Sequence, residues 1–214
     1  VSRIAATVDA SLATVRKAAA QKADLLLVHH GLFWNPQQPW VGKKRDLIGA
    51  LVETNMAVYS AHLPLDLHPH LGNNIGLCRA LKFSKPKPFF EEHDQHIGLQ
   101  VNTRLRRDIL ASRLKNILGA PPVLLRGGPS VCGKIGIVTG GVGGSLAQAS
   151  AEGVDSFITG EGPHWTGALA EELGINVFYG GHYATETFGV KALSESLSKK
   201  FKLPWTFIDH PTGL

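Results

Sequence analysis

Hydrophobic and polar residues alternate along the chain with the periods of short strands and helices. Residues 3–8 are typical of a short strand, residues 12–19 repeat apolar side chains at helical spacing, and residues 25–28 are apolar throughout. A fully apolar run of this kind is typical of a parallel strand that is buried on both faces. The pattern therefore predicts a strand–helix–strand unit, which ends in His29, His30 and Gly31.

The same alternation continues to the end of the chain. We expect further helices over residues 45–53, 73–81, 105–118, 145–151 and 186–201, and a helix around Glu171 that ends at Gly174. We expect further strands over residues 57–59, 121–125, 134–138, 154–158, 177–179 and 204–208. Residues 82–96 contain the run Lys-Pro-Lys-Pro and several acidic residues, which indicates a linker or loop and a domain boundary.

Short sequence matches between the two halves indicate an internal duplication. Residues 58–66 and 178–186 each contain an aromatic strand end, two small residues, a histidine, three further residues and a carboxylate. The expected fold is therefore α/β, with two similar α/β domains over residues 1–90 and 97–214. Open α/β sheets bind ligands at the carboxyl ends of their strands, so these two sets of strand ends would share one cleft.

Composition narrows the classes of protein that fit. The 214 residues are 43% hydrophobic and 18% charged, which is enough for a packed core. No apolar run approaches the ~20 residues of a membrane span, and two cysteines make no disulfide framework, so we expect a protein of the reducing cytoplasm. The net charge of +5 permits nucleic-acid binding, but the basic clusters are scattered along the chain, so a nucleic-acid partner is not expected.

The 10 histidines are the unusual feature of the composition, and several follow predicted strands. Imidazole and carboxylate groups occur together at strand ends as His29 with His30, His62 with Asp66, Glu161 alone, and His182 with Glu186. Both groups bind divalent transition metals. His182 and Glu186 are four residues apart, so on a helical turn they share one face and can reach one ion. Pro64 makes residues 62–66 a loop that enters a turn, where joint ligation is less favoured.

The adjacent pair His29 and His30 is harder to place on one ion. Neighbouring side chains of a regular strand point to opposite faces, so both can face one cleft only where the strand ends and Gly31 lets the backbone turn. The two neighbouring imidazoles then point to two different positions in the cleft. This arrangement fits two metal ions ~3.5–4 Å apart better than one ion.

The remaining candidates have simpler interpretations. We expect the other histidines to be solvated loop residues, namely His68, His70, His93, His96, His164 and His210. Cys78 and Cys132 are expected to be buried as small apolar groups. The glycine run 140–144 lacks the residues of a phosphate-binding loop, so it is expected to serve tight packing between a strand and a helix.

A set of motifs, in this order, resembles the family of GTP cyclohydrolase 1 type 2 homologs, which are dinuclear-metal-centre proteins also called NIF-three-like. The motifs are Asp24-Leu-Leu-Leu-Val-His29-His30-Gly31-Leu-Phe-Trp34, Ser60-Ala-His62-Leu-Pro-Leu-Asp66, Gly72-Asn73-Asn74, Thr159-Gly160-Glu161 and Gly181-His182-Tyr-Ala-Thr-Glu186. The resemblance implies the metal ligands His29, His30, Asp66, His182 and Glu186. It also implies two divalent ions (Zn, Fe, Mn, Ni or Co) in a cleft between two α/β domains, a ring-shaped homohexamer, and an N-terminal element upstream of Val1.

Two functions fit these residues. The first is a metal-dependent hydrolase of a small-molecule substrate, in which two ions deprotonate a bridging water and His62 supports a ligand or transfers a proton. The family name suggests the ring-opening hydrolysis of GTP. The second is a metal carrier or regulatory metal-binding protein with the same site and no catalytic turnover.

Overall fold

The structure, a computed structural model, describes residues 1–34, 36, 39–92 and 94–214, so His93 lies outside the described residues. The chain forms two compact units. The first unit contains Val1–Leu65 and Thr187–His210, and the second contains Asp66–Glu186 and Pro211–Leu214. Each unit has its own sheet and its own buried apolar cluster. This confirms the expected α/β class.

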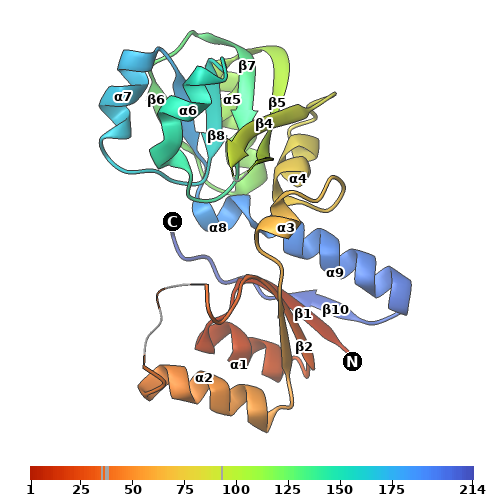
Figure 1. Ribbon diagram of the computed structural model, residues 1–214. Helices are drawn as coiled ribbons and strands as arrows, with labels where there is room; N and C mark the ends of the chain where they lie inside the picture. The colour runs from red at the N-terminus through yellow and green to blue at the C-terminus, as the bar shows by residue number, and fades with distance from the viewer. Residues whose placement is uncertain (35, 37–38, 93) are drawn as a thin grey trace. The chain divides into compact units, whose positions relative to one another are not determined.

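The first unit is built on a parallel sheet of four strands in the order β10-β1-β2-β3. Figure 1 shows α1 and α2 on one side of this sheet and α9 on the other. The strands are β1 (Ile4–Asp9), β2 (Leu25–His30), β3 (Ala57–Ser60) and β10 (Trp205–Phe207), and the helices are α1 (Leu12–Ala20), α2 (Gly42–Glu53) and α9 (Thr187–Phe201).

Local sequence explains why α1 begins where it does. The backbone N–H of Thr14 donates to Oγ of Ser11, and the N–H of Ser11 donates to Oγ1 of Thr14 (3.2 and 2.9 Å). This reciprocal capping box satisfies two of the backbone donors that a helix start leaves open. Val15 of this helix belongs to one buried apolar cluster with Leu26 and Val28 of β2, and β1 and β2 are parallel, which confirms the strand–helix–strand unit predicted for the start of the chain.

The second unit is built on a mixed sheet of six strands in the order β4-β5-β7-β8-β9-β6. Strands β7, β8 and β9 are parallel, whereas β4, β5 and β6 each pair antiparallel. The strands are β4 (Lys87–Glu92), β5 (Gln95–Arg106), β6 (Val123–Arg126), β7 (Val131–Ile137), β8 (Ser156–Thr159) and β9 (Asn176–Tyr179).

The helices of this unit are short, and α6 lies beside α7 (Figure 1). They are α4 (Asn73–Ala80), α5 (Arg107–Leu118), α6 (Leu146–Ala151), α7 (Thr166–Leu173) and α8 (His182–Thr185), and the one-turn helix α3 (Leu63–Asp66) runs from the first unit into this one. Among the described residues, no helix combines the length and apolar character that crossing a bilayer requires.

The prediction of a loop over residues 82–96 was wrong. Strand β4 and the start of β5 form an antiparallel hairpin there. Phe89 and Phe90 are both buried, and Phe90 has a backbone φ of 63°, so two consecutive side chains enter the core. The carboxylate of Glu152 accepts hydrogen bonds from the backbone of Phe90 and Glu91 (2.8 and 3.2 Å). This pairing with a distant residue explains why the local pattern did not predict a strand.

The chain also divides differently from the expected 1–90 and 97–214. Strand β10 pairs with β1, with Ile4 opposite Trp205, and α9 packs against β1 and β2. Residues 187–210 therefore belong to the first unit, although they lie near the end of the sequence. Residues 66–90 belong to the second unit, where β4 pairs with β5. The internal duplication stays a prediction.

Candidate metal centre

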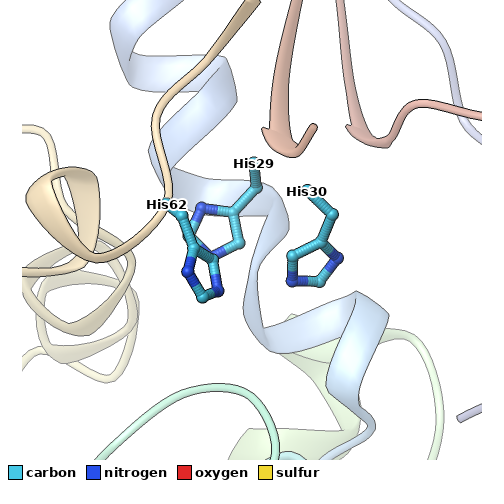
Figure 2. A group of neighbouring side chains, drawn as sticks. All are labelled: His29, His30 and His62. Atoms are coloured by element: carbon cyan, nitrogen blue, oxygen red, sulfur yellow. The ribbon is translucent and has the colours of Figure 1, made fainter. Parts of the chain in front are cut away.

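Three histidine rings gather at one edge of the first unit's sheet (Figure 2). The ring centroids are 4.9 Å apart for His29 and His30, 4.8 Å for His29 and His62, and 5.4 Å for His30 and His62. One ligand nitrogen from each ring lies within 4.8 Å of one from each of the others. We call these three residues the histidine cluster. Its spacing suits chelation of a metal ion by more than one ring.

Parallel pairing of β2 and β3 brings the cluster together. Val28 lies opposite Ser60, and the next backbone bond, from Ala61 N–H to the carbonyl of Val28 (3.0 Å), carries the pairing to the ends of both strands. A side chain at Gly31 would meet Ser60 at 2.8 Å, so glycine lets the two strand ends approach. His29 and His30 lie at the carboxyl end of β2, as predicted, but the strand includes both of them and does not end at Val28; both are buried.

Hydrogen bonds fix which nitrogen of each buried ring carries the proton. Nδ1 of His29 donates to the carbonyl oxygen of Ala61 (3.0 Å), and Nδ1 of His30 donates to the carboxylate of Asp9 (2.7 Å). Because a carbonyl or a carboxylate oxygen only accepts here, the proton of each neutral ring sits on Nδ1. Nε2 therefore keeps its lone pair, which is the arrangement of metal-binding histidines in proteins.

The ring of Trp34 covers His30. The two rings are stacked, with centroids 3.7 Å apart and planes tilted by 16°. His30 is therefore held by Asp9 at one nitrogen and by an aromatic face, which restricts its rotation. Such restriction keeps a ligand atom in place before a metal arrives.

A second group of candidate ligands lies within the second unit, where His182 begins α8. Its Nδ1 donates to Oε1 of Glu161 (2.7 Å), and its Nε2 lies 3.1 Å from Oε2 of Glu186, at ion-pair distance. The predicted four-residue spacing of His182 and Glu186 thus places them together. Gly140, with a backbone φ of 81°, passes so close to Glu186 that a β-carbon there would collide with the carboxylate.

The two carboxylates control the charge of His182. Burial of the ring opposes its charged form, but the hydrogen bonds and negative charges of Glu186 and then Glu161 outweigh this effect and raise the pKa of His182 from 6.5 to about 9. Without metal, His182 is thus protonated at neutral pH. When the Nε2 proton leaves, Glu161 still holds the proton on Nδ1, so the free lone pair is again that of Nε2.

His62 and Asp66 are the other two predicted site residues. His62, expected to support a ligand or move a proton, lies inside the histidine cluster itself. Asp66 ends α3 and accepts a hydrogen bond from Nδ2 of Asn73 (2.7 Å), so this carboxylate is also held in one orientation.

The sequence did not predict that two residues orient the histidines. Asp9 is not among the candidates named from the sequence, and Glu161 is a candidate at a strand end to which no partner was assigned. In the structure, Asp9 lies directly opposite His30 in the pairing of β1 with β2. A carboxylate at the end of the strand that precedes a histidine-ended strand is the signal that could have identified it.

The donor set fits a divalent transition metal. It consists of imidazoles whose Nδ1 atoms are held by acceptors, together with carboxylates, which are ligands that zinc, iron, manganese, nickel and cobalt accept. Fold and donor set together define an α/β protein with a candidate metal centre.

Comparison with known proteins identifies the family. The family Duf34/NIF3 (NGG1p interacting factor 3) matches residues 1–212, and the chain belongs to it. A protein of Halobacterium salinarum named GTP cyclohydrolase 1 type 2 homolog is 41% identical over 221 residues, which cover 100% of this chain and 86% of the relative. A protein of Deinococcus radiodurans with the same name is 38% identical over 218 residues, which cover 100% of this chain and 82% of the relative.

Solved structures show the same fold. The crystal structure of TTHA1606 from Thermus thermophilus matches with a TM-score of 0.91 and 39% identity, and the match covers 100% of this chain and 86% of that one. The predicted resemblance to this family is therefore confirmed.

The charge of His182 gives a testable consequence for the metal-free protein. In a buffer that contains a chelator, the imidazole of His182 should titrate in an NMR experiment with a midpoint near pH 9, because its pKa is raised to about 9. Since the folded pKa lies above the unfolded value, the stability that this proton contributes is present below about pH 6.5 and is lost as the pH rises through 9.

Glu161→Gln should move that midpoint toward 6.5, because it removes one of the two negative charges. Glu195→Gln, which removes a carboxylate paired with Lys199 elsewhere in the chain, is the matched control and should leave it in place. An unchanged midpoint in Glu161→Gln would show that Glu161 does not raise the pKa of His182.

Proposed function

We propose that this protein binds two divalent transition-metal ions and hydrolyses a small-molecule substrate with their help. The ligands in this proposal are His29, His30, Asp66, His182 and Glu186, and His62 is a sixth candidate. The observation that carries the proposal is the histidine cluster, in which Nδ1 of each strand-end histidine is held by an acceptor so that Nε2 keeps its lone pair.

Some candidate ligands lie close in sequence to the positions where the chain passes between the two units. The chain passes from the first unit to the second between Leu65 and Asp66, and returns between Glu186 and Thr187. His62 lies shortly before the first of these crossings, and Glu186 is the last residue before the other. His62, Asp66 and Glu186 are thus all within four residues of a crossing.

In such a centre, metal ions would supply the chemistry and the protein's own groups would orient the ligands. Bound divalent ions would supply Lewis acidity and would lower the pKa of water for hydrolysis. Asp9 and the carbonyl of Ala61 hold the Nδ1 protons of His30 and His29 and fix the orientation of both rings. Glu161 does the same for His182, and Trp34 limits the movement of His30.

The relatives' name, GTP cyclohydrolase 1 type 2 homolog, makes GTP the first substrate to test. We propose ring-opening hydrolysis of GTP as the reaction. The resemblance to dinuclear-metal-centre proteins also leads us to propose a homohexamer in the cytoplasm.

Metal content tests the binding proposal. Protein purified without chelator should carry two ions per chain when measured by inductively coupled plasma mass spectrometry. His30→Ala and His182→Ala should each lower this content substantially, because each removes an imidazole ligand. The matched control is His96→Ala, which removes an exposed histidine of β5 and should retain the full content. Equal metal content in all four proteins would contradict the assignment of ligands.

Turnover separates a hydrolase from a metal carrier. Metal-loaded protein should convert GTP, or a member of a phosphoester and peptide panel, and His182→Ala should lower the rate by at least about a hundredfold, since ligand loss disrupts the whole centre. A rate no higher than that of His182→Ala would overturn the hydrolase proposal. Rapid transfer of metal to an apo-protein acceptor would then favour the carrier.

A further inference from the structure

The first unit contains a cavity of about 590 Å³ near the ends of β1 and β2. It lies between the start of α1, the start of α2 and His210 near the end of the chain. This volume is within the usual range of small-molecule sites, ~300–1,000 Å³. The cavity's described lining residues include none of the metal ligands proposed above.

One part of the cavity lining is apolar. Leu12, Leu32 and Leu47 belong to, or pack against, the buried cluster of the first unit. Trp40 also lines the cavity, and 46% of its surface is exposed. An apolar floor beside an exposed indole suits the flat, apolar body of an aromatic ligand.

The rest of the lining is cationic. Arg16 comes from α1, Lys43 and Lys44 come from α2, and no acidic side chain is among the described lining residues. The ammonium of Lys44 lies 4.5 Å from the centre of the Trp40 ring, so a positive charge and the aromatic wall are side by side. The guanidinium group of arginine matches the oxygens of a phosphate or carboxylate with two parallel hydrogen bonds.

Two further groups add donors to the cationic side. The ammonium of Lys17 donates to Nδ1 of His210 (3.2 Å) and to the carbonyl of Asp209 (3.1 Å). Because Nδ1 accepts that bond, the proton of the neutral His210 ring is on Nε2, which makes Nε2 a donor. Ser11, Leu12 and Ala13 form the start of α1, whose dipole adds positive potential at this end.

We propose that this cavity binds a phosphate monoester that carries a flat aromatic group. The phosphate dianion lies against Arg16, Lys43 and Lys44, and the aromatic group lies over the leucine floor beside Trp40. Three cations favour a dianion over the single negative charge of a carboxylate, and the volume of about 590 Å³ suits a small molecule. The site is independent of the metal centre, so it does not rest on the proposed hydrolysis.

Calorimetric titration with naphthyl phosphate tests the site, with the full chain in a buffer that contains chelator so that metal cannot bind the phosphate. Naphthyl phosphate should bind at least about tenfold more tightly than inorganic phosphate or naphthol, because only the ester uses both halves of the site. Equal affinity for naphthyl phosphate and inorganic phosphate, or for naphthyl phosphate and naphthol, would overturn the proposal.

Variants locate the bound ligand. Arg16→Gln should weaken binding about tenfold, since it removes a charge-assisted hydrogen bond. Arg45→Gln is the matched control, because it removes the same charge from an exposed position on α2 that does not line the cavity. It should change the affinity by less than about twofold. Equal losses in both variants would mean that the anion binds non-specifically.

Two more variants distinguish binding in the cavity from binding at the candidate metal centre. Trp40→Ala should weaken binding of naphthyl phosphate and leave binding of inorganic phosphate unchanged. His30→Ala should leave both unchanged. A loss in His30→Ala as large as that in Arg16→Gln would place the ligand at the histidine cluster and overturn the assignment to this cavity.

Discussion

The chemistry of this protein depends on how Nδ1 is held in three histidines. His29, His30 and His182 each donate from Nδ1 to an oxygen acceptor supplied by another part of the same unit. Each bond fixes both the tautomer and the orientation of its ring, so that the remaining nitrogen, Nε2, is the one that can bind a metal. The ligand atoms are thereby prepared by the protein and need little rearrangement on binding.

The fold supplies these acceptors through strand ends. Asp9 ends β1 directly opposite His30, and Ala61 follows β3, which pairs with β2. Glu161 follows the end of β8 closely, and His182 comes soon after the end of β9, its parallel neighbour. Both units therefore have the same arrangement, in which the carboxyl ends of adjacent parallel strands hold a histidine and its acceptor side by side.

The sequence predicted those features that depend on short stretches of chain. The apolar run of β2 and the four-residue spacing of His182 and Glu186 depend on neighbouring residues, and both were predicted correctly. The hairpin of β4 and β5 was missed, because Glu152 satisfies its backbone from a distant position. The pairing of β10 with β1 was missed for the same reason, since no local pattern reports a partner far along the chain.

The candidate metal site, like the fold, was predicted only where it depends on short stretches of chain. The histidines themselves were identified from their positions after strands, but their acceptors were not, because Asp9 becomes a partner of His30 only through the register of β1 and β2. The place of His62 in the histidine cluster likewise follows from the pairing of β2 with β3.

Anomalous diffraction from crystals of the metal-loaded protein, recorded at the absorption edge of the bound metal, would locate the ions relative to the three histidines. Anomalous peaks are expected at bonding distance, ~2.0–2.2 Å, from the Nε2 atoms of His29, His30 and His182. Metal peaks that lie against Nδ1 of these rings, or away from all three histidines, would show that the held Nδ1 atoms do not prepare Nε2 for metal binding.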